Sequence, residues 1–220
     1  VRLGGESHEW MDNGKFRVAH VGYQSVMAVP HDLYISGYGT DKVNKLTLWS
    51  AEQPHSFDMA AFSRGDYVRA LEQDTMAQPI SKVLYPSDNH TEGKLLRLSQ
   101  QYFLVSASVQ SIVRDHMAVY GTLDNLPEKA AIHINDTHPA LCIPELMRIL
   151  IDDYFYSWDH AWDIVRRTVS YTNHTVMPEA LETWNEDLFK LKLPRIHMIM
   201  TEINERFCRD AWNAFPGNWD

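Results

Sequence analysis

Short apolar stretches dominate the first fifty residues and are typical of β-strands. The segments 17–30 and 43–50 are predicted to be strands. Asn13-Gly14 indicates a two-residue β-hairpin, because both turn positions need a positive φ. Pro30 and the stretch "SGYGT" at 36–40 are expected to interrupt the strand pattern between them. The sequence therefore predicts a β-rich N-terminal portion.

Helical and strand patterns alternate along the rest of the chain. Apolar residues recur at helical spacing from Lys94 to about Tyr120 and from about Pro194 to Ala214, which predicts two long helices. Shorter helices are expected over 56–78, from 139 to about 155, over 157–168 and before 194, and short strands over 81–86, 130–134 and 169–172. This alternation indicates an α/β domain.

Three polar loops share one composition, with Asn or Asp close to His and Thr. They are "LYPSDNHTEG" at 84–93, "INDTHPA" at 134–140 and "SYTNHTVMPEA" at 170–180. Each is predicted to follow an apolar strand and to precede a helix. Ligands of open α/β sheets bind outside the carboxyl ends of the strands. Carboxylates, amides and imidazoles in that place suit a ligand with many hydroxyl groups.

Two other interpretations of these loops stay open at this point. Asp, Asn and Thr before a helix are ordinary N-cap residues, and Pro139 fits the first turn of a helix. His133, Asp136, His138 and His174 are metal ligands in type, although their spacing matches no recognised metal motif. His133 alternates with apolar neighbours in a predicted strand, which favours a structural, hydrogen-bonded histidine.

Composition narrows the classes of partner. The chain has 220 residues and a formal net charge of −9, so nucleic acid and anionic membrane surfaces are poor partners. Cys142 and Cys208 offer neither a disulfide framework nor metal-ligand spacing, which suits a reducing compartment. No apolar run approaches the ~18 residues of a membrane span. The chain starts without Met, inside a predicted strand, and is interpreted as a piece of a longer protein.

Three long motifs resemble the α-glucan phosphorylases, the family of the glycogen, starch and maltodextrin phosphorylases. They are "VLYPSDN" with "EGK" and "QQYF" at 83–103, "NDTHPAL" with "IPELMRIL" at 135–150, and "YTNHTVMPEALE" at 171–182. "VNKLTLWSAE" at 43–52, "GDY" at 65–67 and "EIN" at 202–204 also match the run of the family. The resemblance covers nearly the whole chain, and "DNHT" at 88–91 is closest in style to bacterial maltodextrin phosphorylases.

The resemblance implies a fold and an activity. Residues 1–220 would form the later part of the N-terminal domain, one of two Rossmann-like domains of a GT-B type glycosyltransferase. The parent enzyme would transfer glucosyl units from an α-1,4-glucan to inorganic phosphate, giving glucose 1-phosphate. Its pyridoxal 5'-phosphate would be attached to a lysine outside this chain, so the chain alone is expected to be inactive. The family also implies a homodimeric, cytoplasmic parent.

The resemblance also implies roles for particular residues. His174 matches the family histidine that contacts the glucosyl 6-hydroxyl and whose carbonyl lies near the anomeric centre, a catalytic position. Substrate-binding positions fall on Asp88 and Asn89 of a gate loop, on Arg97, and on Asp136 and His138.

Some residues depart from the family pattern. His90 stands where animal enzymes have Phe, and "VRDHM" at 113–117 has one arginine where regulated enzymes have a pair, which argues against control by AMP. A different function remains open for the chain by itself, namely carbohydrate binding without turnover.

Overall fold

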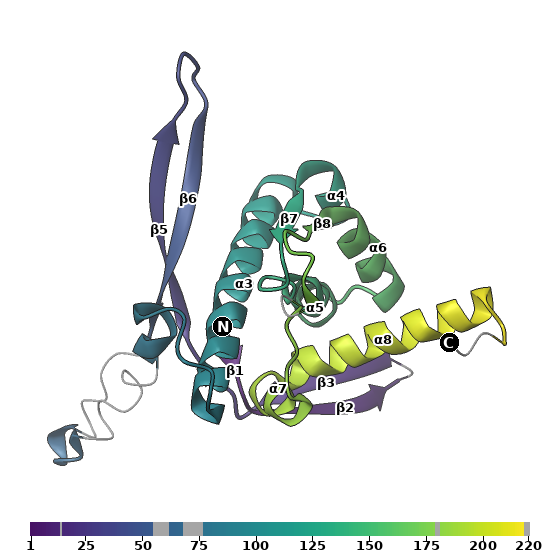
Figure 1. Cartoon of the computed structure of the whole chain (residues 1–220), viewed down its shortest axis with the longest axis horizontal. Helices are drawn as coiled ribbons and strands as arrows, with labels where there is room; N and C mark the ends of the chain where they lie inside the picture. Colours follow the sequence, from purple (N-terminus) through teal and green to yellow (C-terminus); the bar gives the residue numbers. More distant parts are fainter. Residues whose placement is uncertain (14, 55–61, 68–76, 179–180, 218–220) are drawn as a thin grey trace. The chain divides into compact units, whose positions relative to one another are not determined.

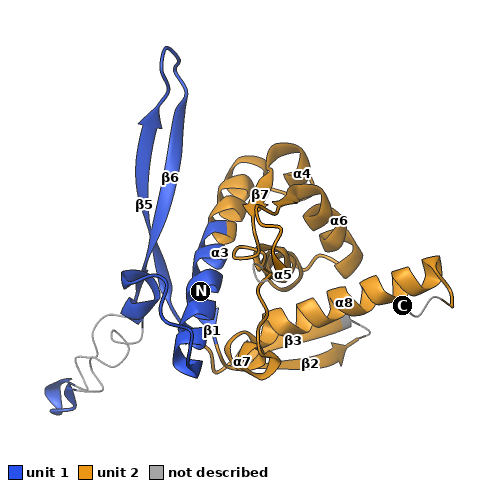
Figure 2. Ribbon diagram, in the orientation of Figure 1, with its two compact units in different colours: residues 1–3, 24–108 blue, residues 4–23, 109–220 orange. Residues whose placement is uncertain are grey.

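The computed structural model describes residues 1–13, 15–54, 62–67, 77–178 and 181–217 (Figure 1). They form two compact units, each discontinuous in sequence, as Figure 2 shows by colour. Unit 1 contains residues 1–3 and 24–108, and unit 2 contains residues 4–23 and 109–220. The mixture of helices and strands agrees with the predicted α/β class.

Unit 1 contains two antiparallel strand pairs. β1 (Arg2–Leu3) pairs with β4 (Gln24–Ser25), and β5 (Met27–Ser36) pairs with β6 (Val43–Glu52) in a long twisted ribbon (Figure 1). The "SGYGT" turn separates β5 from β6, as predicted. Pro30 does not interrupt β5 but lies opposite Trp49. Proline has no backbone N–H to donate. Because the ribbon has two strands, each strand has an outer edge, and an N–H missing on that edge breaks no hydrogen bond between the strands.

The predicted strand over 81–86 is wrong. Residues 77–82 are helical, with Ala77 and Ile80 buried on one face, and the Ser81 hydroxyl accepts a hydrogen bond from the Ala51 N–H at 2.8 Å. The apolar residues that suggested a strand, Val83, Leu84 and Tyr85, are exposed. Most of the helix predicted over 56–78 lies outside the described residues.

The long helix α3 (Thr91–Tyr120) agrees closely with the prediction. It begins in unit 1, where Leu98, Tyr102 and Val105 are buried, and continues in unit 2, where Val109 and Val113 are buried. These apolar positions, three to four residues apart, are the ones that predicted the helix.

Unit 2 begins with the predicted hairpin. β2 (Glu6–Asp12) pairs antiparallel with β3 (Lys15–Val21), and Asn13 in the turn has a φ of 50°. The segment 17–30 is not one strand, however. Gly22, with a φ of 65°, separates β3 from β4, and β5 follows as a third strand.

The rest of unit 2 alternates helices and two parallel strands. Its elements are α4 (Leu126–Lys129), β7 (Ile132–Asn135), α5 (Cys142–Arg148), the π-helix η1 (Ile149–Asp153), α6 (Trp158–Thr168), β8 (Val169–Thr172), α7 (Glu186–Lys192) and α8 (Pro194–Ala214). β7 and β8 pair in parallel, and α5, η1 and α6 form the connection between them. α5 packs against α6 and α8 around the buried side chains of Leu146, Leu150, Ile164 and Ile199.

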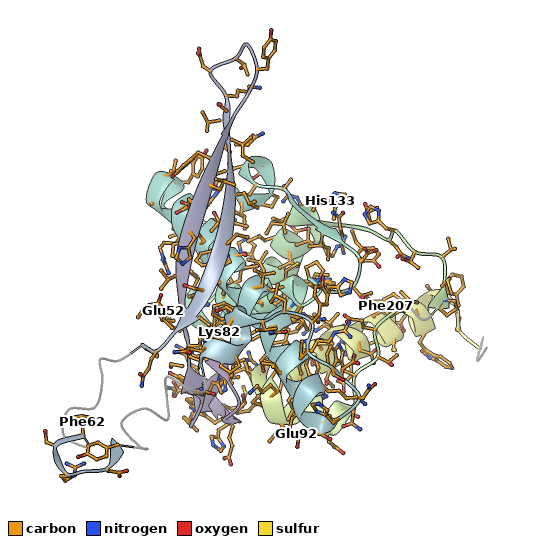
Figure 3. The ribbon with its side chains drawn as sticks, turned by 60° about the vertical axis from the view of Figure 1, so that its left-hand side comes forward. Glu52, Phe62, Lys82, Glu92, His133 and Phe207 are labelled. Carbon is orange, nitrogen blue, oxygen red and sulfur yellow. The ribbon has the colours of Figure 1, made fainter. Side chains whose placement is uncertain are left out.

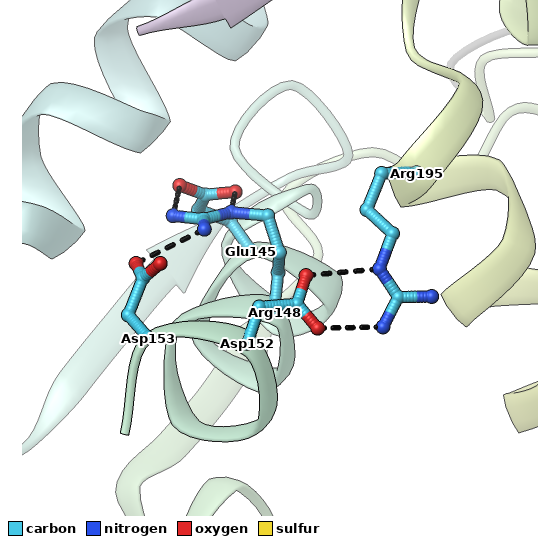
Figure 4. A network of polar contacts seen from close by, with 5 residues as sticks. All are labelled: Glu145, Arg148, Asp152, Asp153 and Arg195. Atoms are coloured by element: carbon cyan, nitrogen blue, oxygen red, sulfur yellow. Dashed lines mark hydrogen bonds and ion pairs between the residues drawn. The ribbon is translucent and has the colours of Figure 1, made fainter. Parts of the chain in front are cut away.

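Two ion-pair groups lie where η1 meets its neighbours (Figure 4). Arg148 makes two hydrogen bonds to the fully buried Glu145, at 2.9 and 3.0 Å, and a third to Asp153 at 3.0 Å. Arg195 of α8 binds Asp152 through two hydrogen bonds of 2.8 and 2.9 Å. These bonds link the end of η1 to α5 and α8.

Within the described ranges, no helix combines the length and apolar character that a membrane span requires.

Candidate functional site

The carboxyl ends of β7 and β8 lie side by side. The register pairs Ile132 with Val169 and Asn135 with Thr172, so both strands end at the same edge. Two of the three polar loops begin there, as predicted. The prediction is wrong for the loop at 84–93, which follows a helical segment and not a strand. Because the two strands are parallel and paired, the loops that follow them begin next to each other.

Asp136 connects the two loops directly. Its backbone N–H donates to the Thr172 carbonyl at 2.8 Å, which extends the strand ladder by one bond. Its side-chain Oδ1 accepts a hydrogen bond of 2.7 Å from the backbone N–H of His174. Asp136 has a φ of 61°, a left-handed conformation that Asp tolerates better than most residues. The structure thus brings Asp136 and His174 together.

The loop around His174 is ordered by its own side chains. Asn173 Oδ1 accepts a hydrogen bond from the Thr175 N–H at 3.1 Å, and Asn173 Nδ2 donates to the Thr175 carbonyl at 2.7 Å. The imidazole of His174 is left exposed, and His138 is exposed on the neighbouring loop. Thr137 donates to Glu182 at 3.4 Å, so Glu182 belongs to the same region although its sequence context gave no sign of it.

The N-cap interpretation fails for α5 and α7. Leu141 is the N-cap residue of α5 and makes no side-chain capping bond, so Asp136 and Thr137 do not cap that helix. Asn185, outside the third loop, caps α7. Near the start of α3 the His90 ring accepts a hydrogen bond from the Gly93 N–H at 2.9 Å, which is a capping arrangement. The polar side chains of the β7 and β8 loops therefore do not serve these helix ends.

His133 has the hydrogen bonds that its position in the strand predicted. Its Nε2 lies 2.7 Å from Thr172 Oγ1, and its Nδ1 lies 3.1 Å from Ser170 Oγ. Figure 3 labels the His133 side chain. Both partners are on β8, so His133 joins the two strands. Among the described residues, no group of three or more His, Cys, Asp or Glu side chains is arranged to hold a metal ion.

The first polar loop belongs to unit 1 and has its own arrangement. Asp88 and Arg97 form an ion pair with 2.6 Å between Oδ2 and Nη1, which ties the loop to the first turns of α3. Asn89, between them in the chain, is exposed. A Cβ on Gly93 would lie 1.8 Å from the Ser87 carbonyl oxygen, so only glycine allows the loop to approach the helix this closely.

Two groups have pKa values shifted by desolvation. Burial raises the pKa of the Cys142 thiol to about 11, so this thiol is neutral and unreactive near pH 7. Burial lowers the pKa of Lys192, at the end of α7.

A cavity of about 1080 Å³ lies elsewhere in unit 2. Its walls include Phe16, Trp158, Arg195 and Arg206. The residues predicted for the site do not line this cavity, and Lys192 does not line it either.

Known proteins similar to this chain form one group. A family model described as carbohydrate phosphorylase matches residues 1–220. Glycogen phosphorylase of Bacillus subtilis is 50% identical over 219 residues, which cover 100% of this chain and 26% of the relative. That of Chlamydia pneumoniae is 45% identical over 221 residues, covering 100% of this chain and 27% of the relative. The human muscle form of glycogen phosphorylase is 47% identical over 205 residues, which cover 90% of this chain and 24% of the relative. The chain thus spans about a quarter of the length of these curated relatives.

Proposed function

The chain belongs to the carbohydrate phosphorylase family, and from this we propose that it forms the later part of the N-terminal domain of a 1,4-α-glucan phosphorylase. The enzyme would transfer the terminal glucosyl unit of an α-1,4-glucan, such as glycogen or maltodextrin, to inorganic phosphate. The product would be glucose 1-phosphate. The motifs that suggested this family from sequence lie in the region that the curated glycogen phosphorylases share with this chain.

One observation carries the proposal: the carboxyl edge of β7 and β8 gathers Asp136, His138 and His174, whose two loops are tied by a hydrogen bond. These side chains do not cap the helices that follow. A glucosyl unit presents several hydroxyl groups, and each one left without a partner in a buried site costs about 1–3 kcal/mol. Carboxylate and imidazole groups at one edge offer the acceptors and donors that such a ligand needs.

The chemistry of glucosyl transfer fits the same edge. A transition state that resembles a glucosyl cation develops positive charge on the sugar ring. Fixed dipoles that point toward this charge lower the barrier, because they stabilise the transition state more than the bound substrate. We assign this role to the peptide group and ring of His174, and we assign Asp136 and His138 to the walls of the sugar site.

Asp88, Asn89 and Arg97 are proposed to form a substrate-binding gate loop of the longer enzyme. The ion pair between Asp88 and Arg97 fixes the base of the loop, while Asn89 is left exposed to contact a sugar hydroxyl. A loop that closes over the substrate would exclude water and so favour phosphorolysis over hydrolysis.

Pyridoxal 5'-phosphate is proposed as the cofactor of the longer enzyme, where its phosphate group would take part in proton transfer. A lowered pKa favours Schiff-base formation by a lysine. Burial lowers the pKa of Lys192, but Lys192 does not line the 1080 Å³ cavity described above, so nothing at that cavity supports attachment there. No step of the mechanism is therefore assigned to the cofactor in this chain.

The remaining parts of the proposal concern the longer protein. It would have two Rossmann-like domains in a GT-B arrangement, form a homodimer and work in the cytoplasm. The free thiols of Cys142 and Cys208 are consistent with a reducing compartment.

Phosphorolysis of maltoheptaose by the full-length protein tests this function, with His174→Ala as the critical variant. We expect wild type to release glucose 1-phosphate and His174→Ala to lower kcat by about 10²–10³-fold, the loss typical of removing one stabilising group from a transition state. His160→Ala is the matched control, because His160 is another exposed histidine of unit 2 on a different element. A wild-type protein that releases no glucose 1-phosphate from any α-glucan would refute the proposal.

A further inference from the structure

The backbone on both sides of His174 is held by side chains. The peptide group before His174 is fixed at its N–H, which donates to Asp136 Oδ1 at 2.7 Å. The peptide group after it is fixed at the Thr175 N–H, which donates to Asn173 Oδ1 at 3.1 Å. A peptide group is planar, so fixing the N–H of Thr175 also fixes the direction of the His174 carbonyl.

These two bonds serve an exposed segment. Asn173 and His174 are both exposed, and residues 173–176 belong to no helix or strand. A segment of this kind samples several conformations unless its polar groups are tied down. Asp136 reaches it from the end of the neighbouring strand β7, in a left-handed conformation that few residues other than glycine adopt without strain.

We infer that Asp136 and Asn173 are positioning residues that together fix the backbone of His174, so that its carbonyl keeps one orientation toward the sugar. The inference rests on the proposed function. It adds to that function a role for Asn173, and it separates the role of Asp136 as an acceptor from the role of its negative charge.

Pairs of variants separate the acceptor from other properties of each side chain. Both Asn173→Asp and Asn173→Ala lose the amide donor to the Thr175 carbonyl. Asn173→Asp keeps an oxygen that can accept from the Thr175 N–H, whereas Asn173→Ala removes it. Asp136→Asn keeps an acceptor and tolerates the positive φ, whereas Asp136→Gly keeps the φ and removes the acceptor. Comparison within each pair therefore isolates the hydrogen bond.

The measurement is kcat and KM of the full-length protein with maltoheptaose and phosphate. A displacement of about 1 Å in a reacting geometry lowers rates by up to ~10²-fold. We therefore expect Asn173→Ala and Asp136→Gly to lower kcat by about 10–10²-fold with a much smaller change in KM. Asp136→Asn should recover about tenfold or more of its loss. Asn173→Asp should recover a smaller part, because it no longer donates to the Thr175 carbonyl.

Asn185→Ala is the matched control. Asn185 Oδ1 also accepts a backbone N–H, from Leu188 at 3.0 Å, but it caps α7 outside the site. Its loss should lower the melting temperature and leave kcat unchanged. A purely structural role for Asp136 and Asn173 would give the same result as this control, and that outcome overturns the inference. Equal losses in Asp136→Asn and Asp136→Gly also overturn it, because they would show that the charge is what matters.

Hydrogen exchange gives a second readout that does not depend on activity. The amides of His174 and Thr175 should exchange faster in Asn173→Ala and Asp136→Gly than in wild type, and the variants that keep an acceptor should restore the protection. Unchanged exchange in all four variants would overturn the inference. If the wild-type protein releases no glucose 1-phosphate, the proposed function fails, and this exchange pattern alone decides whether the two side chains fix the His174 backbone.

Discussion

Arg148 and Arg195 are buried arginines of unit 2, and each faces carboxylates that balance its charge. Glu145 is completely buried against Arg148, and Arg195 is 4% exposed beside Asp152 (Figure 4). A buried pair of this kind adds little net stability over an apolar pair, but removing one partner leaves a charge without compensation. Replacing one residue of such a pair is therefore expected to lower the free energy of unfolding much more than the pair itself contributes.

Asp152→Ala should lower the free energy of unfolding by about 3 kcal/mol, because it leaves the Arg195 guanidinium buried without its carboxylate. Urea denaturation followed by tryptophan fluorescence measures this loss. Adding Arg195→Met should recover a large part of it, since the double variant has no unpaired charge at this position. Arg167→Ala is the control, because the ion pairs of Arg167 are exposed and should matter less. Equal losses for Asp152→Ala and Arg167→Ala would contradict the prediction.

Some residue-level features could be predicted and others could not. The bonds of His133 followed from its place between apolar neighbours on a strand. The positive φ of Asp136 was not predictable, because it arises where β7 ends and its N–H pairs with Thr172 on a strand remote in sequence. Glu182 was missed for a similar reason, since only the folded chain brings it to Thr137.

Helices and strands with clear periodicity or caps were predicted well. α8 spans the predicted residues, β8 agrees to the residue, and α6 begins after Ser157, whose side chain caps it. The strand predicted over 81–86 failed because a short apolar run does not distinguish a strand from a helix end. The π-helix η1 has no sequence signal, since it adds one residue to a turn inside an otherwise ordinary helical pattern. The closeness of the β7 and β8 loops was predicted, because the carboxyl ends of neighbouring parallel strands lie at the same edge of a sheet.

Gly93→Ala tests the junction between the first polar loop and α3. Helix propensity alone would favour alanine by ~1 kcal/mol. The added Cβ would meet the Ser87 carbonyl oxygen at 1.8 Å, however, so the loop must move. We expect the free energy of unfolding to fall by about 1–3 kcal/mol and the KM for maltoheptaose to rise in the full-length protein. Lys94→Ala, an exposed position in the same turn, should change neither quantity. A more stable Gly93→Ala variant would show that propensity outweighs the clash.

At the scale of the whole molecule, the chain corresponds to about a quarter of the length of the curated glycogen phosphorylases that it matches. Its described residues provide a carboxyl edge with polar side chains, and Lys192 does not line the cavity described in unit 2. Under the proposed function, this chain would bind and orient the sugar, while other parts of the longer protein would hold the cofactor.

The 220-residue chain by itself should release no glucose 1-phosphate from maltoheptaose and phosphate, even with added pyridoxal 5'-phosphate. A coupled assay for glucose 1-phosphate measures this, with the full-length protein as the positive control. Calorimetric titration with maltopentaose then shows whether the chain alone still binds glucan. Turnover by the isolated chain would mean that a complete active site lies within these residues.

The discontinuity of unit 2 has a consequence for synthesis on the ribosome. The N–H of Gly4 donates to the Lys192 carbonyl, so the start of the unit is completed only by its end. At about 5–20 residues per second, Lys192 is made roughly 10–40 s after Gly4. During that interval the β2–β3 hairpin lacks helix α8, against which β2 packs in the finished unit. A two-stranded hairpin is marginal by itself, so we expect the hairpin to become stable only after α8 has been made.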